Sequence, residues 1–261
     1  MMRQCSTVVL FVLALPAWAQ PRPETVKAFD RYLATAETRI RAEQESTSSF
    51  LQVTDQKAEA RLRRGEVLIE KMDQTPAEVS GGLIHDWVGT VFLPGASVAQ
   101  VIAFVRDYNH TAQHYQPEVE ASRLLSHTGD DFRVFMRLRK HKIVTVVLDT
   151  GYDVHYGRLD ADHWFSTSHS TRIDEVGGGD HGFLSRLNTY WRFVQVVDGV
   201  IVQCEAISLT RDIPSGLGWM IGPFVTSIPR ESLEFTMTAT RKAVSRAVSQ
   251  SVSNNVKRPT D

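Results

Sequence analysis

The chain has 261 residues, a formal net charge of −1 and 42% hydrophobic residues, which is an ordinary composition for one large globular domain or for one domain with an extension. Acidic and basic residues nearly balance, so the sequence lacks the basic excess that nucleic-acid binding requires. It contains only two cysteines, Cys5 and Cys204, which excludes a framework of several disulfides.

The first nineteen residues have the pattern of a secretory signal. Arg3 is followed by the apolar run Val8–Leu15 and by the small-residue cleavage site Ala17-Trp18-Ala19. The run is shorter than the about 20 residues that span a bilayer, although a retained anchor is the alternative interpretation. We expect cleavage near Gln20 and a periplasmic or secreted protein, in which Cys204 is the only remaining cysteine and a buried, inert thiol.

Residues 20–64 are predicted to form a helical extension. Apolar residues recur every three or four positions between Glu24 and Gln44, and the charged segment Ala58–Arg64 could form a further helical turn. The first helix could cover a cavity mouth, contact a membrane transiently or pack on the outer face of a sheet. Its polar face has mixed charge without a basic bias, which favours packing.

Strands begin after Gly65. Glu66–Met72 and Leu83–Leu93 are the first two candidates, and Pro94-Gly95 ends the second. Ser97 is a suitable N-cap for a short helix that carries four apolar residues. A second short helix is expected at Tyr108–Tyr115.

Six further segments are predicted to be antiparallel strands. In the third of them, Val146, Leu148 and Tyr152 fall on one face, whereas Asp149 and Asp153 fall on the other. One apolar and one polar face is typical of a half-covered antiparallel sheet. The turn Asp198-Gly199 predicts a hairpin between the last two strands. The six segments are Glu118–His127, Phe132–Lys140, Ile143–Tyr156, His163–Val176, Asn188–Val197 and Val200–Arg211.

A long C-terminal helix is predicted to begin near Pro229, since proline is tolerated in a first helical turn. Leu233, Met237, Thr240 and Val244 follow at alternating spacings of four and three, which makes one apolar stripe. The only large apolar surface left to cover this stripe is the sheet. The sequence therefore predicts an α+β protein whose curved antiparallel sheet wraps around this helix, followed by a disordered tail at 251–261.

Together, these elements and three sequence stretches resemble the START-like, or polyketide cyclase/lipid-transport (SRPBCC, Bet v 1-like), superfamily and its helix-grip fold. The stretches are LIHDWVG at 83–89, VIVQCEAISLTRDIP at 200–214 and GLGWMIGPFVTSIPRE at 216–231. The resemblance covers about Gly65 to Val248, within a domain predicted at 65–250, and the stretches look like those of bacterial exported members of unassigned function. It implies an internal cavity that binds a lipid or another apolar small molecule, but transfers no catalytic residue.

Candidate cavity residues are mostly aromatic and aliphatic, and plain core packing is the alternative for each. The polar candidates are Arg192, Glu205 and Arg211, and an unpaired charge at Glu205 would be costly because its strand is mostly apolar. We hypothesise that Arg192 and Glu205 pair across the hairpin and that Arg192 meets a ligand head group; the alternative is an exposed ion pair. The candidates are Val146, Leu148, Tyr152, Trp191, Arg192, Phe193, Glu205, Arg211, Trp219 and Phe224.

Catalytic and metal-binding interpretations are weaker. Asp107, His110 and His114 could share a helix face and hold a metal, but without a distant fourth ligand a solvated polar face is the favoured interpretation, and no metal or cofactor is expected. Asp180-His181 could be an acid–base pair on a glycine-rich loop. The sequence favours a carrier or sensor of an apolar ligand. The alternatives are a cyclase/dehydratase-type enzyme using His181, Asp149 or Glu205, and a partner-binding protein with a collapsed core.

Overall fold

The computed structural model describes residues 21–52, 55–72, 75, 77–141, 145–177, 184–211 and 218–256, with the backbone alone at 218–225 and 251–256. The expected signal segment therefore lies outside the described residues. The helices are α1 (Pro23–Gln44), α2 (Gln56–Arg63), α3 (Val98–Arg106), α4 (Thr111–His114) and α5 (Gly218–Val256). The strands are β1 (Leu68–Lys71), β2 (Ala77–Val79), β3 (Gly82–Pro94), β4 (Val119–Thr128), β5 (Asp131–His141), β6 (Thr145–Arg158), β7 (His163–Glu175), β8 (Arg186–Val196) and β9 (Gly199–Arg211).

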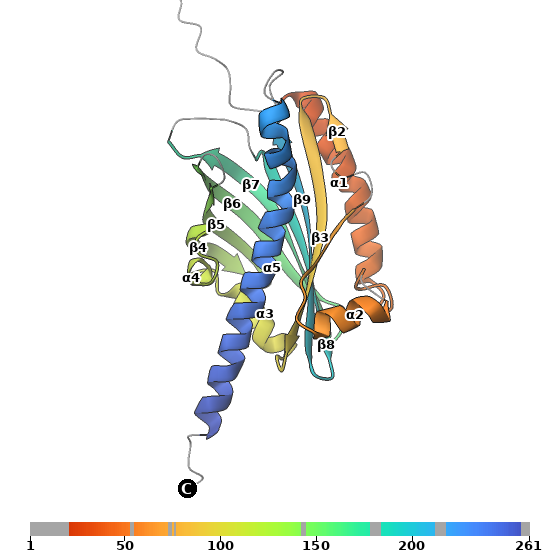
Figure 1. Cartoon of the computed structure of the whole chain (residues 1–261), viewed down its shortest axis with the longest axis vertical. Coiled ribbons are helices and arrows are strands. Elements are labelled where there is room, and N and C mark those ends of the chain that lie inside the picture. Colours follow the sequence, from red (N-terminus) through yellow and green to blue (C-terminus); the bar gives the residue numbers. More distant parts are fainter. Residues whose placement is uncertain are drawn as a thin grey trace, which may run out of the picture.

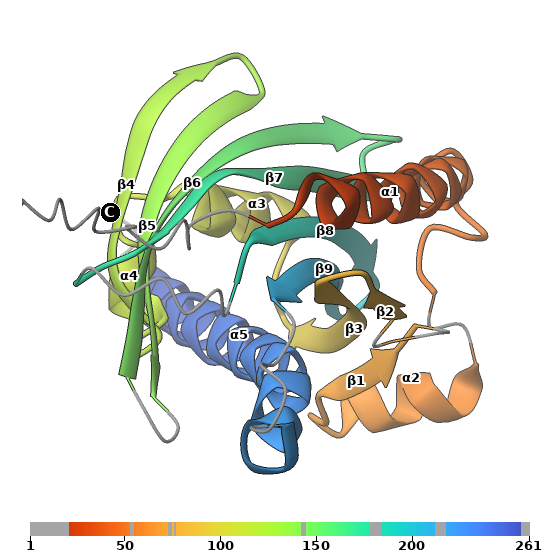
Figure 2. The same cartoon turned by 90° about the horizontal axis from the view of Figure 1, so that it is seen from above.

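In the described part of the chain, the strands form one antiparallel sheet in the order β1-β3-β9-β8-β7-β6-β5-β4, with β2 also paired to β3. The sheet curls around α5, as the view from above shows (Figure 2). This is the helix-grip arrangement, so the predicted α+β fold class is confirmed. The short strand β2 was not predicted, because its residues lie in a segment that also contains Pro76 and two glycines.

The hairpin between β8 and β9 is present one residue earlier than predicted. Val196 pairs with Gly199, so the two loop residues are Val197 and Asp198. Gly199 already belongs to β9. It has to be a glycine, because a side chain there would collide with the carbonyl oxygen of Leu93 on β3. The glycine is needed for a close approach between strands and not for the turn itself.

Helix α5 lies along the concave face and is longer than predicted (Figure 1). It begins at Gly218, so Pro229 lies inside the helix; the preference of proline for a first turn does not exclude an interior position. The helix continues to Val256, so residues 251–256 of the tail predicted at 251–261 are helical, whereas 257–261 lie outside the described residues.

The predicted stripe of α5 packs on β3 at close range. Leu233, Met237 and Val244 are buried in one apolar cluster with residues of β3, β9 and α3. Gly89 permits this approach, since a Cβ atom there would lie 2.8 Å from Cγ of Met237 and 2.9 Å from Cγ of Leu233. The helix is therefore held against one side of the sheet's concave face.

Helices α3 and α4 lie at one end of the sheet (Figure 1). Ser97 caps α3 as predicted: its Oγ accepts a hydrogen bond from the backbone N–H of Gln100, and the Gln100 side chain accepts one from the backbone N–H of Ser97. Helix α4 is tied to α5 by a hydrogen bond of 2.7 Å between the hydroxyls of Tyr115 and Thr240. These two short helices therefore connect the sheet to α5.

The N-terminal extension packs on the outer, convex face of the sheet, as the sequence favoured. Phe29 and Ile40 of α1 are buried against Tyr190 of β8 and Ile207 of β9. Leu62 of α2 is buried beside apolar residues of β1, β3 and β9. No helix within the described ranges is long and apolar enough to cross a membrane. Strands β8 and β9 are consequently covered on both faces.

Candidate ligand-binding pocket

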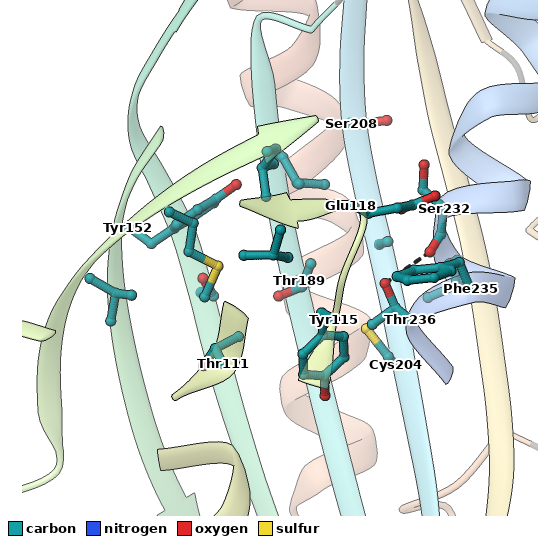
Figure 3. A pocket seen from close by; sticks show the side chains of 18 of the residues that line it. Thr111, Tyr115, Glu118, Tyr152, Thr189, Cys204, Ser208, Ser232, Phe235 and Thr236 are labelled. Atoms are coloured by element: carbon teal, nitrogen blue, oxygen red, sulfur yellow. Dashed lines mark hydrogen bonds between the residues drawn. The ribbon is translucent and has the colours of Figure 1, made fainter. Parts of the chain in front are cut away.

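A pocket of about 670 Å³ lies between α5 and the concave face of the sheet. Strands β5 to β9 form its walls together with α4 and α5, and Figure 3 shows Tyr152 and Thr189 lining the same space as Phe235 and Thr236. Most of the lining is apolar, as is usual for sites that bind small organic molecules. The aliphatic and aromatic wall includes Val134, Met136, Leu138, Val146, Leu148, Val154, Leu187, Trp191, Phe193, Leu233 and Phe235.

The pocket exists because short side chains meet on adjacent strands. Ser168 of β7 pairs with Thr189 of β8, and Thr189 pairs with Ala206 of β9. On the same face, Ser166 lies two residues before Ser168 on β7 and Ser208 lies two residues after Ala206 on β9, so they flank this row on opposite sides. Large side chains at these positions would reach α5, but serine, threonine and alanine leave the volume between sheet and helix unfilled.

Five of the residues predicted from the sequence line this pocket. They lie on β6 and β8, where alternate residues point toward α5, so the predicted apolar face is the concave face. Trp219 and Phe224 fall where the structure describes the backbone alone. Arg211, at the end of β9, is half-buried and does not belong to the described lining. The five lining residues are Val146, Leu148, Tyr152, Trp191 and Phe193.

Arg192 and Glu205 do not line the pocket, which corrects the sequence-based hypothesis. Their neighbours Trp191 and Cys204 face the pocket, so the alternation of a strand turns Arg192 and Glu205 to the convex face beneath α1. Both side chains are only 1% exposed, so the alternative of a solvent-exposed pair is wrong as well. Arg192 lies opposite Gln203, and its guanidinium is 4.0 Å from the Glu205 carboxylate.

The closest partners of both residues come from the N-terminal extension. Arg192 donates to Oε2 of Glu43 at 2.5 Å and to Oε1 of Gln203 at 3.1 Å. Glu205 accepts from Arg39 at 2.5 Å. A network of charged groups therefore fixes α1 to strands β8 and β9, and the function of Arg192 and Glu205 is structural.

Asp86 of β3 belongs to the same buried layer. Its Oδ2 accepts a hydrogen bond of 2.9 Å from the hydroxyl of Tyr32 on α1. Burial, followed by the nearby carboxylate of Glu205, raises the pKa of Asp86 to about 7. Asp86 is therefore half protonated near neutral pH, and a protonated Asp86 can donate to Glu205.

Polar groups inside the pocket were mostly missed from the sequence. Glu118, just before β4, forms an ion pair with Lys140 at the end of β5, and burial raises the pKa of Glu118. Tyr108 and Tyr156 share a hydrogen bond of 2.7 Å between their hydroxyls. The serines of β7 could have been found from the sequence, because strand alternation puts Ser166 and Ser168 on the face opposite to His163 and His169.

The described catalytic candidates lie away from the pocket. Asp149 forms a bidentate pair with Arg137 on the convex face, with N–O distances of 2.7 and 2.8 Å, and Glu205 lies beneath α1. Asp180 and His181 lie outside the described residues. Cys204 lines the pocket, but burial raises the pKa of its thiol well above the ordinary value, so it is uncharged.

The proposed metal cluster on the short helix does not form. His110 Nδ1 lies 2.8 Å from the Asp107 carboxylate, whereas the ring of His114 packs 4.9 Å from that of Phe104. Throughout the described ranges, no three His, Cys, Asp or Glu side chains are placed to hold one metal ion.

The order of elements, the curled sheet and the gripped C-terminal helix identify the fold. It is a helix-grip fold. Among solved structures, the chain is similar to a STAR-related lipid transfer protein fragment from Xanthomonas axonopodis, with 21% identity and a TM-score of 0.47 over 68% of this chain and 98% of that one. TTHA0849 from Thermus thermophilus has 16% identity and a TM-score of 0.48 over 61% and 97% of the two chains.

A third similar structure is the Zhui aromatase/cyclase from Streptomyces sp. R1128, with 12% identity and a TM-score of 0.46 over 63% of this chain and 96% of that one. No protein-family model and no curated protein matches the sequence. At these identities and TM-scores, the START-like neighbours assign neither a ligand nor an activity to this chain.

Proposed function

We propose that this protein is an exported START-like protein that binds a lipid or another apolar small molecule in the pocket and carries or senses it without catalysis. The pocket itself is the main support: about 670 Å³ of space lies beneath α5, with a largely apolar lining. Volumes of this size are typical of sites for small organic ligands. A partner-binding protein with a collapsed core would not contain an internal volume of this size.

Catalysis has less support, because the charged groups Glu118 and Lys140 pair with each other and the tyrosines Tyr108 and Tyr156 are linked by their hydroxyls. The alternative of a cyclase/dehydratase-type enzyme rests on Glu118, whose raised pKa suits a general acid on the wall of the pocket. Turnover of a bound compound that stops in Glu118→Gln would favour this alternative.

The test of the proposed function is to purify the mature protein from its own host and to identify co-extracted molecules by mass spectrometry. We expect an apolar compound in stoichiometric amount. The proposal would be contradicted if the purified protein contained no such compound and also bound no apolar probe.

Filling the pocket should strongly reduce the amount of apolar compound that is purified with the protein. We expect Thr189→Phe to lower the amount of bound compound about tenfold, because the phenyl ring would occupy the space at the centre of the concave face. The matched control is Thr167→Phe, which adds the same ring to the opposite face of the neighbouring strand. Circular dichroism and thermal unfolding would verify that both variants fold. Equal amounts of bound compound in the two variants would show that the compound binds outside this pocket.

The export of the protein is tested separately. We expect the intact mass of the native protein to begin near Gln20 and the protein to appear in the periplasmic or secreted fraction. An intact chain that begins at Met1 and sediments with membranes would instead indicate a retained N-terminal anchor.

A further inference from the structure

The concave face carries four hydroxyl groups that have no partner within the described structure. Ser166 and Ser168 of β7, Thr189 of β8 and Ser208 of β9 all line the pocket, and we call them the hydroxyl floor. None of the four side chains forms a hydrogen bond with another described residue. Ser166 is 3% exposed and Ser208 is 4% exposed, so these two residues lie in the interior of the protein, on the wall of the pocket.

The oxygens of these hydroxyls are open to the pocket, because none of them is among the described polar atoms that are fully enclosed by protein without a hydrogen-bond partner. A buried polar group without a partner costs about 1–3 kcal/mol, which is why the large majority of such groups in folded proteins are hydrogen-bonded. Other hydroxyls of the same pocket follow this rule, because Ser232 donates to the carbonyl oxygen of Ile228 at 2.8 Å and Thr236 donates to that of Ser232 at 2.8 Å. The hydroxyl floor therefore differs from the hydroxyls on α5 and suits an external partner.

The strand register sets the spacing of these groups. Ser168 and Thr189 are directly opposite each other, and residues in this relation lie about 5 Å apart. Ser166 lies two residues along β7 from Ser168, which corresponds to about 7 Å. A flat or elongated guest resting on the floor would therefore meet hydrogen-bonding groups at separations of about 5 to 7 Å along one side.

We infer that the guest is a neutral apolar molecule that carries hydroxyl, carbonyl or ether oxygens along one side; this inference rests on the proposed function. A hydroxyl can donate and accept, so the floor recognises such oxygens without requiring charge. Of the charged lining residues, Glu118 and Lys140 pair with each other, and Glu175 has an interaction partner as well. With about 30 Å³ per water-sized group, 670 Å³ accommodates roughly twenty non-hydrogen atoms.

The inference is tested with pyrene, 1-hydroxypyrene and pyrene-1-carboxylate, which share one apolar skeleton. Binding is measured by quenching of tryptophan emission, because Trp191 lines the pocket. We expect 1-hydroxypyrene to bind about fivefold more tightly than pyrene, as one net hydrogen bond allows, and pyrene-1-carboxylate to bind more weakly than either. In the quadruple variant Ser166→Ala/Ser168→Ala/Thr189→Val/Ser208→Ala, which removes the whole floor, the preference for 1-hydroxypyrene should fall to about onefold to twofold, while pyrene binding is retained.

The matched control is Thr167→Val, which removes a hydroxyl on the opposite, convex face of β7 and should leave the preference unchanged. If the quadruple variant fails to fold, the double variant Ser166→Ala/Ser208→Ala replaces it and should halve the preference or more. Failure of all three probes to bind the native protein would overturn the proposed function. Binding of pyrene and 1-hydroxypyrene with equal affinity, a preference that survives the floor substitutions, or tightest binding of the carboxylate would overturn this inference and leave the proposed function standing.

Discussion

Replacing Arg192 with alanine is expected to lower the free energy of unfolding by about 3–5 kcal/mol, because it leaves buried carboxylates without their counter-charge. Arg192 is 1% exposed and donates to Glu43, with Glu205 at 4.0 Å. Without it, Glu43 and Glu205 would have to share the single guanidinium of Arg39. The measurement is urea-induced unfolding at pH 7, followed by tryptophan fluorescence.

The control is Arg133→Ala, which breaks an ion pair with Asp153 on the same convex face. Both partners of that pair are more than half exposed, so its loss should leave the stability nearly unchanged. A loss of less than about 1 kcal/mol in Arg192→Ala would show that the buried network contributes little. If Arg192→Ala instead bound less ligand at unchanged stability, Arg192 would contribute to ligand binding, as the sequence-based hypothesis predicted.

The second large effect concerns pH. Asp86 has a pKa of about 7 in the folded protein, raised from 3.8 by burial and by Glu205. The folded state therefore favours the protonated carboxyl, and the free energy of unfolding falls as the pH rises from about 4 to 7. Asparagine at this position has no proton to lose and can donate to Glu205 in the same way. We expect Asp86→Asn to stabilise the protein by about 2–4 kcal/mol at pH 8 and by almost nothing at pH 4.

Urea titrations of native protein and variant at several pH values measure this difference. Asp149→Asn provides a control of opposite sign, because Arg137 holds the pKa of Asp149 below its usual range, so neutralising it should cost some stability at pH 8. The groups around Asp86 are Tyr32, Arg39 and Glu205. An Asp86→Asn variant whose stability has the same pH dependence as the native protein would show that Asp86 is ionised at neutral pH.

Alternation of side chains made much of the fold predictable. On β6, Val146, Leu148 and Tyr152 alternate with the charged Asp149 and Asp153, and the structure places the first set toward α5 and the second on the convex face. The signal is clear because this part of the sheet is covered on one side only. The spacing of Leu233 and Met237 likewise identified the buried face of α5.

The same reasoning failed on β8 and β9 because both faces of these strands are buried. Arg192 and Glu205 stood out as charges in apolar strands, which suggested a cavity. Their partners Glu43 and Arg39 lie 149 and 166 residues away in sequence, respectively, and no local pattern links them. A helix that brings its own counter-charges to a buried face can be recognised only when the tertiary contacts are known.

The residues of strands β8 and β9 have two separate roles, one on each face of the sheet: lining the pocket and anchoring α1. Thr189, Ala206 and Ser208 line the space that a guest would fill, whereas Arg192 and Glu205 anchor α1 to the back of the same strands. A mutant library confined to the first set should therefore retain a high proportion of folded members. Such a library would make this chain a scaffold for directed evolution of new specificities, with the anchoring residues left untouched.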